Sequence, residues 1–214
     1  MAQLFLITHP QNPQARLMRQ AAAIVRQGGL IVYPTDSCYA FGCQLGNAEA
    51  AGRIRRLRGL DDRHHFTLVC RDLAELGRYA RVDNRQFRLL RAATPGSYTF
   101  ILQATREVPR RMMHPRRSTI GLRVPSHPVV DALLRELGEP LLSSTLLLPG
   151  DEWPDNDAER IRERLEHHVD LVIDAGPCGI EPTTVVDLTV DPPEVLRAGK
   201  GPVEPLGLER PEGG

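Results

Sequence analysis

Short apolar runs alternate along the chain with segments in which apolar residues recur at helical spacing. Most of these runs end at proline, glycine or a polar residue, as strands do where sheet pairing stops. The runs predict strands at 5–8, 30–33, 68–70, 98–102, 119–124, 140–145, 171–174, 184–188 and 194–197. Because strands and helices alternate without strict βαβ units, we predict an α/β fold, a twisted mixed sheet with helices on its faces.

Capping residues mark the predicted helix starts. These starts are Asn12 before Pro13, Asn47, Asp72 with Glu75, Asp83 with Gln86, and Ser126 followed by His127 and Pro128, and a further polar helix is predicted over 157–167. Residues 1–201 are predicted to form a single domain. The remainder, 202–214, is rich in Pro, Gly and Glu and is expected to be a loose tail.

The strand at 30–33 runs into Pro34, which cannot continue a sheet ladder. Thr35, Asp36 and Ser37 follow at its carboxyl end, which is where ligands bind in open α/β sheets. The local pattern leaves two interpretations open. One is a small-molecule pocket, and the other is a strand followed by an Asx-type turn.

The composition of the chain limits which classes of function it can have. The chain has 214 residues, 41% of them apolar, which is enough for one large core. Its 27 basic and 27 acidic residues cancel, so bulk charge favours neither a nucleic-acid nor a membrane partner. The four cysteines lack zinc-type spacing and the N-terminus lacks a signal or spanning segment, so we expect a soluble cytoplasmic protein with reduced thiols and no metal site.

Two arginines stand inside apolar strands, although the sequence contains no P-loop, no G-x-G-x-x-G and no G-x-S-x-G motif. Arg123 and Arg197 would be costly to bury unpaired. A buried carboxylate partner is one explanation, and a bound phosphate or carboxylate is the other. Hydroxyl clusters near the strand ends favour an anionic ligand.

Five segments, in this order, carry a resemblance to a known family. They are YPTDSCYAFG (33–42), PGSYT (95–99), RVPSHP (123–128), TTVVD (183–187) and RAG (197–199). They resemble the motifs Y-P-T-[DE]-T-x-Y-G-L-G, P-G-P-x-T, R-x-P-x-H-P, S-T-V-V-D and R-x-G of the YrdC-like family of threonylcarbamoyl-AMP synthases. The chain is most similar to the YciO branch of that family.

The resemblance implies a large, concave, positively lined cavity that binds ATP with Mg²⁺, L-threonine and hydrogencarbonate. It implies formation of L-threonylcarbamoyl-adenylate for the t6A modification of tRNA, with no side chain assigned a catalytic role. By motif, the threonine-binding residues would be Thr35, Thr183 and Thr184. The nucleotide and phosphate region would be lined by Arg58, Arg63, Thr99, Arg123, Ser144, Thr145 and Arg197. Further pocket-lining candidates are Asp36, Ser37, His64 and Thr67.

The sequence departs from the synthase pattern at two polar positions. The family's K-x-R stands here as Arg58-Gly59-Leu60, and its S-A-N-x-[ST]-G stands as TLLLPG (145–150), with Leu147 in place of the asparagine. These changes remove a guanidinium and an amide from a polar site, and Arg63 is a candidate replacement for the charge. We therefore expect weak or altered activity on threonylcarbamoyl-AMP.

Two interpretations without catalysis stay open. One is binding of double-stranded RNA or tRNA through arginines at 53, 55, 56, 58, 106, 110, 111, 116 and 117. Aromatic residues make up only 5% of the chain, which favours shape-based binding of folded RNA over stacking on single strands. The other is a nucleotide-binding regulatory subunit of a modification enzyme.

Overall fold

A computed structural model describes residues 1–7, 9–61 and 66–211. The strands are β1 (Gln3–Leu6), β2 (Ile31–Tyr33), β3 (Ala40–Gln44), β4 (Thr67–Val69), β5 (Tyr98–Gln103), β6 (Thr119–Arg123), β7 (Leu141–Thr145), β8 (Leu171–Asp174), β9 (Thr184–Asp187) and β10 (Glu194–Arg197). The helices are α1 (Ala15–Arg26), α2 (Ala48–Arg58), α3 (Leu73–Tyr79), α4 (Asn84–Ala93), α5 (Pro128–Leu137) and α6 (Ala158–Leu165), with single 3₁₀ turns η1 (Arg110–Met112) and η2 (Glu204–Leu206).

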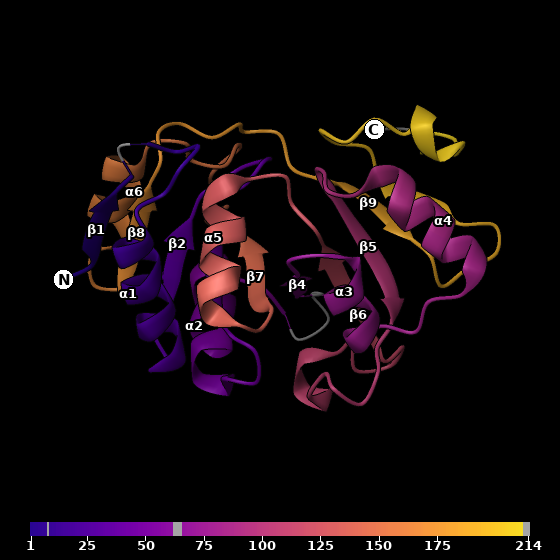
Figure 1. The fold of residues 1–214 in the computed structure, drawn as a ribbon, viewed down its shortest axis with the longest axis horizontal. Coiled ribbons are helices and arrows are strands. Elements are labelled where there is room, and N and C mark those ends of the chain that lie inside the picture. The colour runs from indigo at the N-terminus through magenta and orange to yellow at the C-terminus, as the bar shows by residue number, and fades with distance from the viewer. Residues whose placement is uncertain (8, 62–65, 212–214) are drawn as a thin grey trace.

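All these strands form one mixed sheet, which confirms the predicted fold class. Their order is β1-β8-β2-β3-β7-β4-β6-β5-β9-β10. β2 pairs parallel with β8 and antiparallel with β3, and β4 pairs parallel with β6 and antiparallel with β7. The sheet therefore joins two halves, one around β2 and one around β6, through β7 and β4 at its centre (Figure 1).

Two apolar cores lie on opposite faces of the sheet. Side chains alternate between faces along a strand, so Ile31 and Tyr33 of β2 pack in one core and Val32 in the other. The smaller core lies under α1 and α5, which pack side by side over the β2 half (Figure 1). No helix in the described part of the chain is both long and apolar enough to cross a membrane.

Strand β3 is a segment that the sequence pattern did not predict. Pairing with β2 and β7 makes this segment a strand, since its own apolar and polar residues do not alternate. Gly42 allows β3 to pack closely against its neighbours, because a Cβ at position 42 would lie 2.5 Å from Leu141 and 2.8 Å from Tyr33. The glycine thus serves close strand packing in this hairpin.

Helix starts match the prediction at most capping residues. The Asp83 carboxylate accepts from the backbone of Gln86, whose side chain accepts in return, so this capping box is complete. Asn12 was the wrong start for α1, because its backbone closes a turn onto His9 and the helix begins at Ala15.

The helix after residue 126 also starts differently from the prediction. His127 is its N-cap, and the His127 Nδ1 atom accepts from the backbone N–H of Val129 at 3.3 Å. Ser126 is used elsewhere, because its own N–H donates to Asp36.

Residues 202–211 differ from the expected loose tail. Val203 and Leu206 are buried in the larger core, and η2 packs against α4 near the C-terminus (Figure 1). Burial of these two side chains outweighs the local effect of the neighbouring prolines and glycines.

The docked tail gives a test of stability. We expect Leu206→Ala to lower the free energy of unfolding by about 2–4 kcal/mol, because it leaves a cavity in a packed site. Urea denaturation measures this change. Glu209→Ala, at an exposed position of the same segment, is the matched control and should change stability by less than about 0.5 kcal/mol. Equally small effects of both substitutions would show that the segment does not contribute to the core.

Candidate functional site

A cavity of about 490 Å³ opens on the sheet face that α1 and α5 cover in part. A row of paired residues crosses four strands there, from Ser143 on β7 to Thr67 on β4, Gly121 on β6 and Ile101 on β5. Two residues before Ser143 in β7, Leu141 packs in the core below α1 and α5. Beyond the helices the same face therefore presents hydroxyl groups among apolar side chains, a combination that is usual in ligand cavities.

Gly121 forms part of the cavity floor. A Cβ at this position would lie 3.0 Å from the Thr67 hydroxyl and 3.2 Å from the Thr99 methyl group. The glycine therefore lets three strands present polar atoms close together beneath the cavity.

Arg58 reaches the cavity from the C-terminal end of α2. Its Nη1 donates to Ser144 Oγ at 2.6 Å, and its Nε donates to the carbonyl of Leu147 at 3.2 Å. Burial lowers the pKa of this guanidinium, and the nearby positive charge of Arg197 lowers it further. An arginine stays protonated under these conditions, so an anion in the cavity would relieve both effects.

Arg197 reaches the cavity from β10 without a carboxylate partner among the described residues. Its Nη2 donates to the Thr183 carbonyl at 2.9 Å and its Nε donates to the same carbonyl at 3.2 Å. The Thr183 hydroxyl in turn lies 2.9 Å from that of Thr99. Burial lowers the pKa of Arg197, and Arg123 lowers it further, so this end of the cavity also favours an anion.

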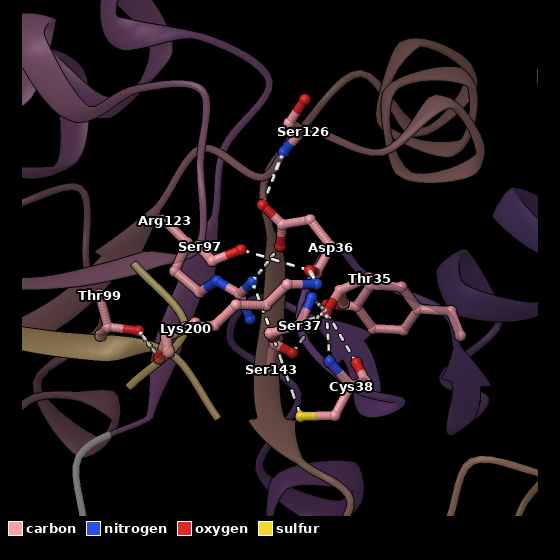
Figure 2. A network of polar contacts seen from close by, with 12 residues as sticks. Thr35, Asp36, Ser37, Cys38, Ser97, Thr99, Arg123, Ser126, Ser143 and Lys200 are labelled. Carbon is pink, nitrogen blue, oxygen red and sulfur yellow. Dashed lines mark hydrogen bonds and ion pairs between the residues drawn. The ribbon is translucent and has the colours of Figure 1, made fainter. Parts of the chain in front are cut away.

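Arg123 has the buried carboxylate partner that was one of its two predicted explanations. Its Nη2 donates to Asp36 at 2.6 Å and to Ser37 Oγ at 3.2 Å, and the side chains of Arg123 and Asp36 are only 7% and 9% exposed (Figure 2). Arg123 also lines the cavity, and its buried Nε has no hydrogen-bond partner among the described residues. The pair is therefore internally neutral but keeps one donor unused beside the cavity.

The Asp36 loop is held from several sides. The Asp36 carboxylate also accepts from the Ser126 N–H at 2.9 Å. Its backbone carbonyl accepts from Ser97 at 3.3 Å and from Lys200, the only lysine in the chain (Figure 2). Segments far apart in the sequence are thus joined at this one residue.

The turn after β2 combines the two local interpretations of the sequence. The Thr35 hydroxyl donates to the Cys38 carbonyl at 2.7 Å and accepts from the N–H groups of Ser37 and Cys38 (Figure 2). Thr35 is therefore a turn-forming residue behind the cavity wall.

The Thr184 hydroxyl is also used in hydrogen bonds to the backbone, with Gly199 and Gly201 as its partners. Direct contact of either hydroxyl with threonine stays a prediction.

Most of the predicted site residues come together at the cavity. Its lining includes Arg58, Thr67, Thr99, Arg123, Ser144, Thr145, Thr183 and Arg197. Asp36 and Ser37 lie directly behind Arg123, while Arg63 and His64 fall outside the described residues.

Several lining residues were not predicted. Ser143, Ile101 and Val185 stand two positions from predicted residues on the same strands, so the alternation of side chains would have found them. Trp153 and Glu152 belong to the segment between β7 and α6, which has no periodic pattern of apolar residues. No group of three or more metal-ligating side chains occurs in the described part of the chain.

Comparison with known proteins places these features in a family. The family model of Sua5, YciO and YrdC, described as "Telomere recombination", matches residues 23–199. The protein YciO of Escherichia coli (strain K12) is 57% identical over 96% of this chain and 100% of its own length, and its crystal structure superposes with a TM-score of 0.93.

Synthases of the family are more distant relatives. A threonylcarbamoyl-AMP synthase of Halorhodospira halophila is 32% identical over 83% of this chain and 93% of its own length. The crystal structure of P. abyssi Sua5 complexed with L-threonine is 24% identical, covers 94% of this chain and 58% of that one, and has a TM-score of 0.85, so it shares the fold. The predicted resemblance is confirmed: the chain belongs to the Sua5/YciO/YrdC family.

Proposed function

We propose that the cavity binds ATP and L-threonine and that the protein forms L-threonylcarbamoyl-adenylate from them and hydrogencarbonate. The observation that carries this proposal is the convergence of the Arg58 and Arg197 guanidiniums, together with Thr99, Thr183 and Ser144, on one cavity. Among the described residues, Arg197 forms no ion pair with a carboxylate and donates to the Thr183 carbonyl instead. The volume of the cavity lies in the range usual for small-molecule sites.

The reaction needs positioning and charge stabilisation rather than a side-chain nucleophile. The threonine amine and hydrogencarbonate form a carbamate and water. A carbamate oxygen then attacks the α-phosphorus of ATP, and the bond to the leaving diphosphate breaks. Guanidinium groups and hydroxyls suit this step, because negative charge grows on phosphate oxygens.

Magnesium would enter with ATP as part of the substrate. Its ligands would be phosphate oxygens and water, which fits a cavity whose described lining offers Glu152 as its one carboxylate. The arginines would share the neutralisation of the triphosphate.

The weakest part of the proposed synthase site is the wall at residue 147. Leu147 is a lining residue of the cavity, and its carbonyl accepts from Arg58. The asparagine of the family pattern would add amide donors and an acceptor at this wall. We infer that the protein synthesises threonylcarbamoyl-AMP slowly, or catalyses the reverse reaction or hydrolysis of that compound. The reason is that a leucine at position 147 cannot stabilise charge.

A second candidate function is binding of double-stranded RNA or tRNA. The observation favouring it is a second hollow of about 780 Å³, lined by Arg81, Arg106 and Arg110 and with no carboxylate in its described lining. Exposed arginines near it, such as Arg116, would extend a positive footprint for phosphates.

The two arginines at the cavity, Arg58 and Arg197, give the first test of the proposed nucleotide site. We expect Arg58→Gln and Arg197→Gln each to weaken ATP binding by about 10- to 100-fold, because each removes a charge-assisted bond to phosphate. Calorimetric titration measures the dissociation constants. Arg56→Gln is the control, at an exposed position of the same helix, and should stay within about twofold of the unsubstituted protein. A loss shared equally by all three variants would contradict a specific phosphate site.

Residue 147 tests the proposed chemistry. We expect Leu147→Asn to raise the rate of diphosphate release with ATP, threonine and hydrogencarbonate by about tenfold, because the amide restores a hydrogen bond to developing charge. Leu147→Ala controls for loss of bulk alone. If the asparagine variant is no faster than the alanine variant, the missing amide is not what limits the reaction.

Salt dependence tests the RNA candidate. The combined substitution of Arg106, Arg110 and Arg116 by Gln is expected to weaken RNA binding and to flatten the log–log salt dependence by about 0.7–0.9 per lost phosphate contact. Filter binding at graded salt concentrations measures both quantities. Arg16→Gln, on α1, is an exposed control. An affinity that does not change with salt would exclude this candidate.

A further inference from the structure

The single tryptophan of the chain stands at the cavity rather than in a core. Trp153 is 55% exposed, whereas large aromatic side chains such as Tyr33, Tyr39, Phe41, Phe66 and Phe100 are fully buried. It lines the 490 Å³ cavity on one side and a shallower outer hollow on the other. An indole combines a large apolar face with a polar N–H group, and tryptophan is enriched at interaction sites for this reason.

Carboxylate–arginine hydrogen bonds fix the segment on both sides of Trp153 to helix α6. Two residues later, the buried Asp155 carboxylate accepts from Arg160 at 2.6 and 2.7 Å and from Arg164 at 3.4 Å. Two residues earlier, Asp151 accepts from Arg164 at 3.0 Å. The ring is therefore carried on an anchored segment while its surface stays free, which keeps the ordering cost of binding low.

The cavity has polar and apolar parts that suit the two ends of a nucleotide. Arg58 and Arg197 provide cationic groups for a phosphate. Leu147, Trp153 and Leu196, the last 46% exposed, add apolar surface to the same lining. A flat, uncharged heterocycle joined to a phosphate matches this combination, and an amino acid alone does not use the aromatic surface.

We propose that Trp153 is the stacking platform for the nucleobase of the nucleotide that occupies the cavity. This inference rests on the proposed nucleotide site and assigns a specific residue to recognition of the base. Stacking of a base on an aromatic side chain contributes enough affinity that its loss weakens binding by about 10-fold or more. The interaction needs only an aromatic face, so phenylalanine at this position should retain most of the binding.

The fluorescence of the single tryptophan provides a direct test with AMP as the probe. AMP is expected to quench the emission of Trp153 in a saturable way, whereas ribose 5-phosphate, which lacks the base, should not. By calorimetry, Trp153→Ala should bind AMP at least about 10-fold more weakly while its affinity for ribose 5-phosphate stays unchanged, and Trp153→Phe should recover most of the affinity for AMP. Ile180→Ala is the matched control, because Ile180 is 44% exposed and lines only the outer hollow beside Trp153.

Several results would overturn the inference. It fails if the unsubstituted protein does not bind AMP, if Trp153→Ala binds AMP as tightly as the unsubstituted protein, or if Ile180→Ala weakens AMP binding as much as Trp153→Ala. Failure of the proposed synthesis is seen separately. If AMP quenches and stacks but no adenylate forms from ATP, threonine and hydrogencarbonate, only the reaction is contradicted. If adenylate forms and Trp153→Ala leaves the KM for ATP unchanged, only the stacking role is contradicted.

Discussion

The buried ion pair between Asp36 and Arg123 is the interaction on which the site depends. Asp36 follows β2 in one half of the sheet and Arg123 ends β6 in the other, with β3, β7 and β4 between them. Removing one member of such a buried pair costs about 3–5 kcal/mol, because the other charge is left without compensation. The Asp36 loop and the cavity wall are therefore fixed together, and the Arg123 charge is balanced before any ligand arrives.

The second constraint is that two helices cover only part of one sheet face. Where α1 and α5 pack, the strands present apolar side chains such as Tyr33 and Leu141, and beyond them the same face carries hydroxyls and arginines. Asp36 compensates the charge of Arg123, while Arg58 and Arg197 add further guanidinium groups to the cavity lining. The fold thus separates a structural arginine, which sets the wall, from two arginines that are suited to bind an anion.

Much of this arrangement could be predicted from the sequence, since apolar alternation and capping residues such as Asp83 are local signals. The family motifs also selected most of the cavity lining. The remainder depends on contacts between distant segments: β3 exists because β2 and β7 pair with it, and residues 203–206 are ordered by burial against the core. Trp153 was missed for the same reason, because no periodic pattern places its segment against the sheet.

If the proposed reaction occurs, the cationic cavity holds L-threonylcarbamoyl-adenylate made from its three precursors. Native mass spectrometry of the protein after incubation with ATP and Mg²⁺, L-threonine and ¹³C-labelled hydrogencarbonate tests this. We predict a bound species with the mass of the adenylate that contains the label, and its absence when threonine is left out. A protein that carries only ATP, or no ligand, under conditions in which a family synthase forms the labelled adenylate would contradict the claim.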